Sequence, residues 1–168
     1  YRLPTEAEWE FAARGGDPTK DDWNYVFSGA DTAEGVSYDS SINAGLDSVG
    51  WYCYNNRTGI TQNYDETLEV SGKGTHQVGK KDPNRLGLYD MSGNVSEWCS
   101  DWYSSSYYSE SPNNNPINTS KSSSRVIRGG CWYYDAASCR VSFRNSISPD
   151  SRNNRIGFRL ALVRDDAD

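Results

Sequence analysis

The sequence predicts a single, loop-rich α+β domain whose core depends on aromatic side chains. The chain has 168 residues, a length that suits one domain. Leu, Ile, Val and Phe together number only 26, a composition that usually warns of disorder. Six Trp and 12 Tyr nevertheless predict a folded domain, because each buried aromatic removes about 150–250 Å² from water. One helix signal and a few short strand signals, separated by irregular stretches, complete the prediction.

Charge and hydropathy argue against two classes of partner. The chain carries 17 Lys+Arg against 23 Asp+Glu, which gives a net charge of −6. Binding to a phosphate backbone needs clustered basic residues, so we expect no nucleic-acid partner. No apolar run approaches the roughly 18 residues of a membrane span, so we expect none in this chain.

The clearest regular element is a helix near residue 5. Thr5 is the predicted N-cap, and Glu8, three residues later, completes a capping box. Gly15 and Gly16 predict a left-handed end to this helix.

The centre of the chain is irregular from residue 17 to residue 81. Residues 49–52 alone resemble a strand there. A turn is predicted at residues 92–94, and the alternation that begins at Val95 predicts a strand over residues 95–100. Asn and Pro residues at 113–116 predict a loop.

Two further strands are expected near the end of the sequence. Residues 125–130 form the first and end in a Gly pair, and residues 156–163 form the closing strand. The 25 residues between them show no periodicity. So long a loop in a small domain is usually functional or disordered.

The cysteines do not form a recognisable site. Cys53, Cys99, Cys131 and Cys139 include no CxxC pair, and His76 is the only histidine. A zinc site and a Ser-His or Cys-His nucleophile are therefore disfavoured. Three disulfide pairings and four free thiols all remain open.

Three blocks of sequence are distinctive in their order and spacing. The first is Arg2-Leu3-Pro4-Thr5-Glu6-Ala7-Glu8-Trp9-Glu10-Phe11-Ala12-Ala13-Arg14-Gly15-Gly16, and the second is Gly87-Leu88-Tyr89-Asp90-Met91-Ser92-Gly93-Asn94-Val95-Ser96-Glu97-Trp98. The third is Arg128-Gly129-Gly130 followed by Ile156-Gly157-Phe158-Arg159. Together these blocks resemble the formylglycine-generating-enzyme, or sulfatase-modifying-factor, family. The resemblance implies one domain over residues 1–168 with a variant of the C-type lectin fold. The family domain normally has more sequence before the first block.

The family's oxidases use a copper-bound cysteine pair shortly after the Gly-Gly of the third block. Cys131 and Cys139 fall in that stretch, but the interval is shorter than the enzymes require. We therefore expect no enzymatic activity and no catalytic residue. The alternative is a copper-dependent formylglycine-generating oxidase that acts on a protein cysteine through Cys131 or Cys139.

The resemblance also implies a structural calcium site. The family's ligand positions correspond to the side chains of Asp90 and Glu97 and the backbone carbonyls of Gly93 and Val95. Calcium prefers such oxygen ligands, and a Gly turn directs carbonyls towards one point. In the alternative, Asp90 caps the turn and Glu97 pairs with an arginine such as Arg159.

Within the family, residues 131–155 resemble the variable region of proteins diversified by diversity-generating retroelements. In those systems random replacement of template adenines turns Asn codons into many others, but never into codons for Lys, Glu, Gln, Met or Trp. Residues 133–154 contain none of these five types. Trp132, Arg140, Arg144, Pro149 and Arg152 have the character of scaffold positions.

The resemblance therefore predicts a non-enzymatic, receptor-like variable protein, or else a purely structural domain in which these aromatics are core. Tyr, Ser and Asn suit an adaptable binding surface. The ligand is expected to be a protein or a cell-surface molecule, with the chain at the cell surface or outside the cell. The predicted ligand-binding residues are Tyr133, Tyr134, Asp135, Ala137, Ser138, Phe143, Asn145, Ile147, Ser148, Asp150, Ser151 and Asn153.

Overall fold

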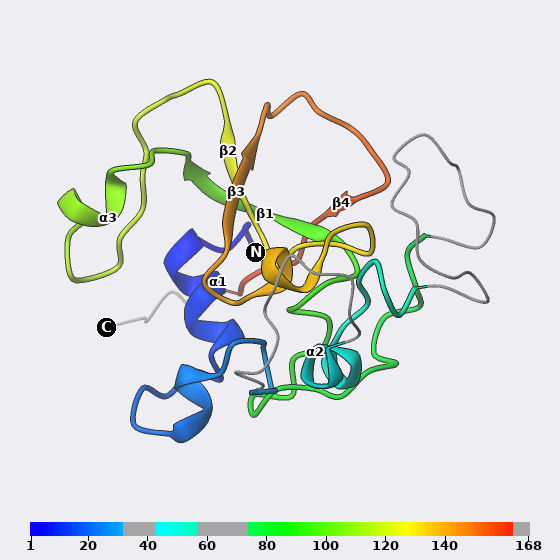
Figure 1. The fold of residues 1–168 in the computed structure, drawn as a ribbon. Coiled ribbons are helices and arrows are strands. Elements are labelled where there is room, and N and C mark those ends of the chain that lie inside the picture. The colour runs from blue at the N-terminus through cyan, green and yellow to red at the C-terminus, as the bar shows by residue number, and fades with distance from the viewer. Residues whose placement is uncertain (32–42, 57–73, 163–168) are drawn as a thin grey trace.

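A computed structural model describes residues 1–31, 43–56 and 74–162. Its centre is a four-stranded sheet of order β3-β2-β1-β4, in which β1 is antiparallel to β2 and parallel to β4 (Figure 1). β3 pairs antiparallel with β2 at the other edge. The strands are β1 (Ser96–Trp102), β2 (Arg125–Arg128), β3 (Arg144–Ile147) and β4 (Ile156–Gly157). The architecture confirms the loop-rich α+β fold.

Helix α1 (Glu6–Ala13) has the ends that the sequence predicts. Thr5 Oγ1 accepts a hydrogen bond from Glu8 N at 3.1 Å, and Glu8 Oε2 accepts one from Thr5 N at 2.8 Å. After the helix, Gly15 has a φ of 82°, a left-handed conformation that a side chain would strain. The helix packs against β1 and β2.

The strand predicted at residues 49–52 is wrong, because helix α2 (Ala44–Val49) occupies the start of this segment. Asn43 caps it through a 3.0 Å hydrogen bond from Leu46 N to its side-chain oxygen. Leu46 and Val49 are buried on one face of the helix, a spacing that suits a helix as well as a short apolar run. A Cβ on Gly50 would lie 1.8 Å from Ser92 O, so the chain must leave the helix with a glycine.

The last third of the chain contains more structure than its sequence pattern indicates. The supposed loop at residues 131–155 includes β3, which has no alternation of buried and exposed residues and is held by pairing with β2. The closing strand is shorter than predicted: β4 has two residues, and only an isolated bridge between Arg2 and Ala161 follows. Val163 lies outside the described residues. The remaining short helices are η1 (Asp21–Asn24), α3 (Tyr107–Glu110) and η2 (Ala136–Cys139).

Two clusters form the core, and aromatic side chains are central to both. Trp9, Met91 and Val126 anchor the cluster between α1 and the sheet. Phe27, Tyr52 and Leu46 anchor a second cluster that includes α2 and reaches η2. Among the residues that the structure describes, no helix combines the length and apolar character needed to cross a membrane.

Candidate ligand-binding surface and cation site

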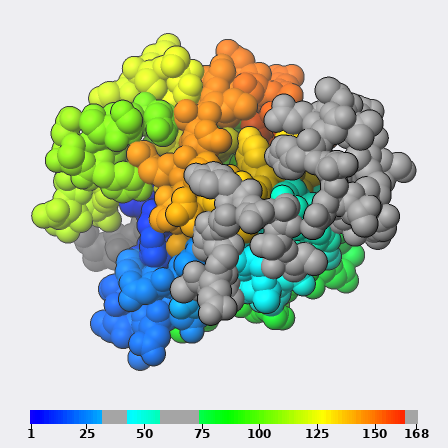
Figure 2. Space-filling view, in the orientation of Figure 1, coloured from blue at the N-terminus to red at the C-terminus, as the bar shows by residue number. Residues whose placement is uncertain are grey.

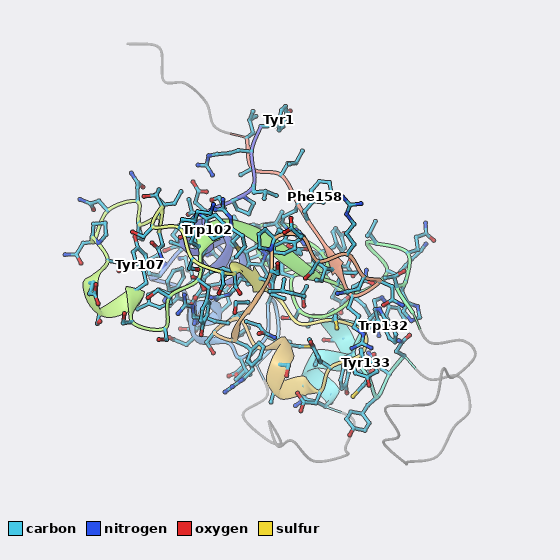
Figure 3. All side chains as sticks on the ribbon, turned by 90° about the horizontal axis from the view of Figure 1, so that it is seen from above. Tyr1, Trp102, Tyr107, Trp132, Tyr133 and Phe158 are labelled. Atoms are coloured by element: carbon cyan, nitrogen blue, oxygen red, sulfur yellow. The ribbon has the colours of Figure 1, made fainter. Side chains whose placement is uncertain are left out.

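Trp132 fixes both ends of the connection that carries the predicted binding residues. Its indole N–H donates a 3.0 Å hydrogen bond to Asn154 O, so residue 132 is tied to residue 154. Its backbone N donates to Asn94 O at 2.9 Å, and its side chain is only 7% exposed. Trp132 and Tyr133 lie together on the side of the molecule away from Phe158 and Tyr1 (Figure 3). The structure thus confirms a scaffold role for Trp132.

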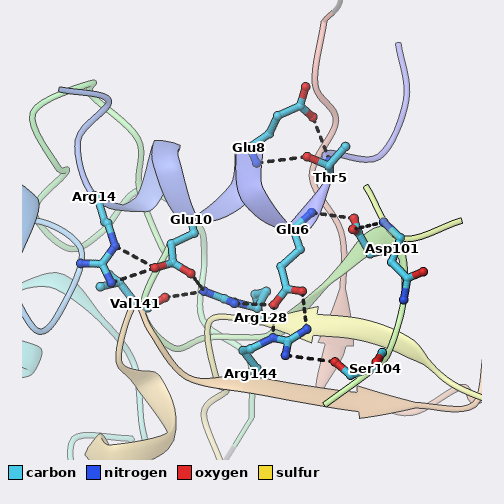
Figure 4. A network of polar contacts seen from close by, with 11 residues as sticks. Thr5, Glu6, Glu8, Glu10, Arg14, Asp101, Ser104, Arg128, Val141 and Arg144 are labelled. Carbon is cyan, nitrogen blue, oxygen red and sulfur yellow. Dashed lines mark hydrogen bonds and ion pairs between the residues drawn. The ribbon is translucent and has the colours of Figure 1, made fainter. Parts of the chain in front are cut away.

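Arg144 ties the middle of the segment to helix α1 (Figure 4). Its guanidinium donates to both carboxylate oxygens of Glu6, at 2.6 and 2.7 Å, and to Ser104 O at 3.2 Å. Buried Arg128 reaches Glu6 at 2.5 Å and Glu10 at 2.6 Å. Because planar guanidinium–carboxylate pairs fix orientation as well as distance, β3 is held in one position against α1.

Most of the predicted binding residues have accessible surface. The exposed ones are Ser148, Asp150 and Asn153, in the loop between β3 and β4 that extends away from the sheet (Figure 1). The half-buried ones are Tyr133, Tyr134, Asp135, Ser138, Phe143, Asn145, Ile147 and Ser151. The residues after 125, yellow to orange, gather across the top and centre of one face (Figure 2).

Ala137 is the exception among the predicted binding residues, because it is buried. It lies within η2 and is 3% exposed, so it has almost no surface to offer a ligand. The 3₁₀ turn that buries it begins at Asp135, whose side chain accepts a 3.0 Å hydrogen bond from Ser138 N. Asp135 therefore also has a structural role as a helix cap.

Arg155 also lines this surface, although it is not among the predicted ligand-binding residues. Its guanidinium lies 3.7 Å from the centre of the Tyr133 ring and 6.0 Å from that of Trp132. An arginine in a loop-rich fold can bond backbone carbonyls and acids, because its guanidinium has five donors. Arg140 and Arg144 do so, whereas the Arg155 side chain makes no hydrogen bond or ion pair within the described residues.

The cysteines that would serve an oxidase are buried free thiols. Cys131 and Cys139 are both 0% exposed, and neither forms a disulfide. Burial raises the pKa of the Cys131 thiol and raises that of Cys139 well above its ordinary value. Copper binding and nucleophilic attack use the thiolate, which these environments disfavour at neutral pH.

Three of the four predicted calcium ligands, Asp90, Val95 and Glu97, line one pocket of about 430 Å³, and Gly93 does not line it. Asp90 Oδ2 accepts a hydrogen bond from Gly79 N at 2.8 Å, whereas its buried Oδ1 has no partner among the described residues. Asp90 and Gly93 have φ angles of 57° and 94°, so the chain turns sharply here, as predicted.

Glu97 is paired with Arg159, as the alternative to calcium expected. The guanidinium of Arg159 donates to both oxygens of Glu97, at 2.6 and 2.7 Å, and the Trp9 indole donates at 2.7 Å. The described residues include no cluster of three or more His, Cys, Asp or Glu side chains suited to a metal. A cation at this turn would use Asp90 Oδ1 and backbone carbonyls, with Glu97 shared with Arg159.

Comparisons with known proteins identify relatives of differing function. The chain is 39% identical over 166 residues to a formylglycine-generating enzyme of Streptomyces coelicolor, covering 95% of this chain and 46% of that protein. It is 33% identical to the chaperone protein LppX of Paenibacillus barcinonensis, covering 89% and 46%. The chain therefore spans about half the length of these relatives.

A solved structure is similar to this chain in both fold and sequence. Treponema denticola variable protein 1 superposes with a TM-score of 0.61 and 36% identity, covering 94% of this chain and 45% of that one. The family model described as the sulfatase-modifying factor enzyme 1-like domain matches residues 1–164. The chain therefore belongs to the sulfatase-modifying factor enzyme 1-like domain family.

Proposed function

We propose that this chain is a non-enzymatic, ligand-binding variable protein that presents residues 133–154 to its ligand. The observation that carries the proposal is the contrast within this segment. Trp132 N donates to Asn94 O and the Arg144 guanidinium pairs with Glu6, both outside the segment, while Ser148, Asp150 and Asn153 are exposed. Substitution at the exposed positions leaves the anchoring contacts in place, which is what a diversified surface requires.

The similarity to Treponema denticola variable protein 1 supports the same proposal, because that protein is called variable and covers 94% of this chain. Tyr133, Tyr134 and Phe143 supply large aromatic area with few rotatable bonds, and the Ser and Asn side chains supply hydrogen bonds. The proposed partner is a protein or another cell-surface molecule, met at the cell surface or outside the cell.

The test is deep sequencing of the encoding locus and its flanks in many cells of the source population. The proposal expects a near-copy of the 3′ end nearby, with adenines wherever codons 133–154 differ between cells. Two variants that differ only in this segment should then bind different ligands. An invariant segment without a second copy would contradict the proposal.

A formylglycine-generating-type oxidase is the competing function, because a relative with 39% identity is such an enzyme. The raised thiol pKa values of Cys131 and Cys139 weigh against it. Copper titration and oxygen consumption with a cysteine-containing peptide decide the matter. The oxidase would replace the display function if the protein binds copper stoichiometrically, loses this copper in Cys139→Ser and oxidises the peptide catalytically.

We also propose that the turn at Asp90 binds calcium as a structural ion. The buried Oδ1 without a partner supports this, because a hard cation would satisfy it. When bound, the ion supplies positive charge that holds the turn. The residues that would hold it are Asp90 and Glu97 through their side chains and Gly93 and Val95 through their carbonyls.

A further inference from the structure

A pocket of about 320 Å³ opens within the proposed binding surface, beside the strands of the sheet. Strand β2 contributes Ile127, the end of β3 contributes Ile147, and β4 contributes Ile156. Tyr134, Asn153 and Arg155 also line the pocket, together with Ser96 and Asn154. The volume lies in the range of small-molecule sites, and the three Ile side chains make part of the lining apolar.

Arg155 gives this pocket a cation that no carboxylate among the described residues neutralises. Six other arginines pair with carboxylates: Arg2, Arg14, Arg85, Arg128, Arg144 and Arg159. Arg155 has no such partner within the described residues, and its stacking on Tyr133 at 3.7 Å holds it in place. A guanidinium with unused donors beside an apolar lining is suited to an anion attached to an apolar group.

We propose that this pocket binds an apolar residue carrying an adjacent carboxylate, as found at the C-terminus of a peptide. Arg155 binds the carboxylate, and Ile127, Ile147 and Ile156 cover the side chain. A carboxylate fits better than a phosphate, because one guanidinium matches its two oxygens and its single charge. The inference rests on the proposed display function and specifies the ligand class of that same surface.

The position of Arg155 in the chain separates the contact to the carboxylate from the contacts to the ligand side chain. Arg155 is the last residue of the segment 131–155 and is not among the predicted ligand-binding residues, whereas Tyr134, Ile147 and Asn153 are. Variants of this protein therefore keep the carboxylate-binding cation while the walls around the ligand side chain change. The carboxylate is a constant requirement, and the preferred side chain differs between variants.

The test is an NMR titration of this chain with N-acetylphenylalanine and with its uncharged analogue N-acetylphenylalaninamide. We expect millimolar binding of the acid and at least tenfold weaker binding of the amide. Arg155→Gln should lose at least tenfold in affinity for the acid, while Arg155→Lys retains part of it. Arg152→Gln removes an exposed neighbouring charge and is the matched control, with unchanged binding expected.

Ile147→Phe tests the Ile lining of the pocket. The larger side chain fills the pocket and should weaken N-acetylphenylalanine binding at least tenfold. Spectra of each variant verify the fold. Equal binding of acid and amide, no binding of either, or full binding by Arg155→Gln would overturn the inference. Locus sequencing separates the two proposals: a diversified locus without carboxylate selectivity overturns the pocket alone, and an invariant locus overturns the display function.

Discussion

Arg144 and Glu6 form a bidentate ion pair across 138 residues of sequence, with both N···O distances at 2.6–2.7 Å. The pair joins β3, within the proposed variable segment, to the first turn of α1. Glu6 is 3% exposed and also contacts Arg128, while its backbone N donates to Asp101 at 2.7 Å. The proposed binding surface is therefore attached to helix α1.

Arg144→Gln should lower the free energy of unfolding by about 2–4 kcal/mol, because it leaves Glu6 buried with only Arg128 to compensate its charge. Arg152→Gln, at an exposed position in the same segment, should change it by less than about 0.5 kcal/mol. Urea denaturation of both variants measures the difference. Equal stability of the two would show that the ion pair does not anchor the segment.

Trp132→Ala should destabilise the protein by about 3–5 kcal/mol, since it removes a buried indole and the bond that ties residue 132 to Asn154. Ser148→Ala and Asp150→Ala should each stay within about 0.5 kcal/mol, as expected at exposed sites. Urea denaturation distinguishes these cases. A loss above 1 kcal/mol at both exposed positions would favour the purely structural domain.

Chelation should lower the melting temperature, and added calcium should restore it. A ligand that binds only the folded state at a hundred times its Kd adds about 2.7 kcal/mol of stability. Asp90→Asn should abolish the response, and Asn tolerates the left-handed φ of 57° at this position. Asp150→Asn is the control that should keep it. A melting temperature indifferent to both treatments would contradict the calcium site.

The protein should become less stable as pH falls below about 6.5, because the folded state disfavours the charged form of His76. Burial lowers the pKa of His76 from 6.5, Lys81 lowers it further, and Asp90 opposes them. The ring stacks on Trp51 at 3.8 Å and contacts the Asn56 side-chain oxygen. The unfolded state therefore binds the proton more strongly, so stability is lost from pH 6.5 down to the folded-state pKa.

Thermal melts between pH 7 and pH 5 measure this loss. His76→Gln removes the only histidine of the chain, and its melting temperature should vary less over the same interval. An unchanged slope in this variant would assign the pH dependence to other groups.

Local signals were sufficient for several elements of the fold. The capping box of Thr5 and Glu8, the turn at Gly93 and the alternation in β1 all depend on neighbouring residues, and the structure contains all three. The scaffold character of Trp132 and Arg144 was also predictable. Residues 49–52 were assigned wrongly because a short apolar run fits a helix end as well as a strand.

The sequence by itself determined the family, the loop-rich α+β class and the segment that carries the proposed binding residues. Only the tertiary structure decided that Ala137 is buried, that β3 pairs with β2 and that Glu97 pairs with Arg159. It also decided that Arg155 lines a pocket and has no acidic partner in the part of the chain that the structure describes. These properties depend on contacts between residues distant in the chain, and burial and charge pairing across such distances leave no periodic signal in the sequence.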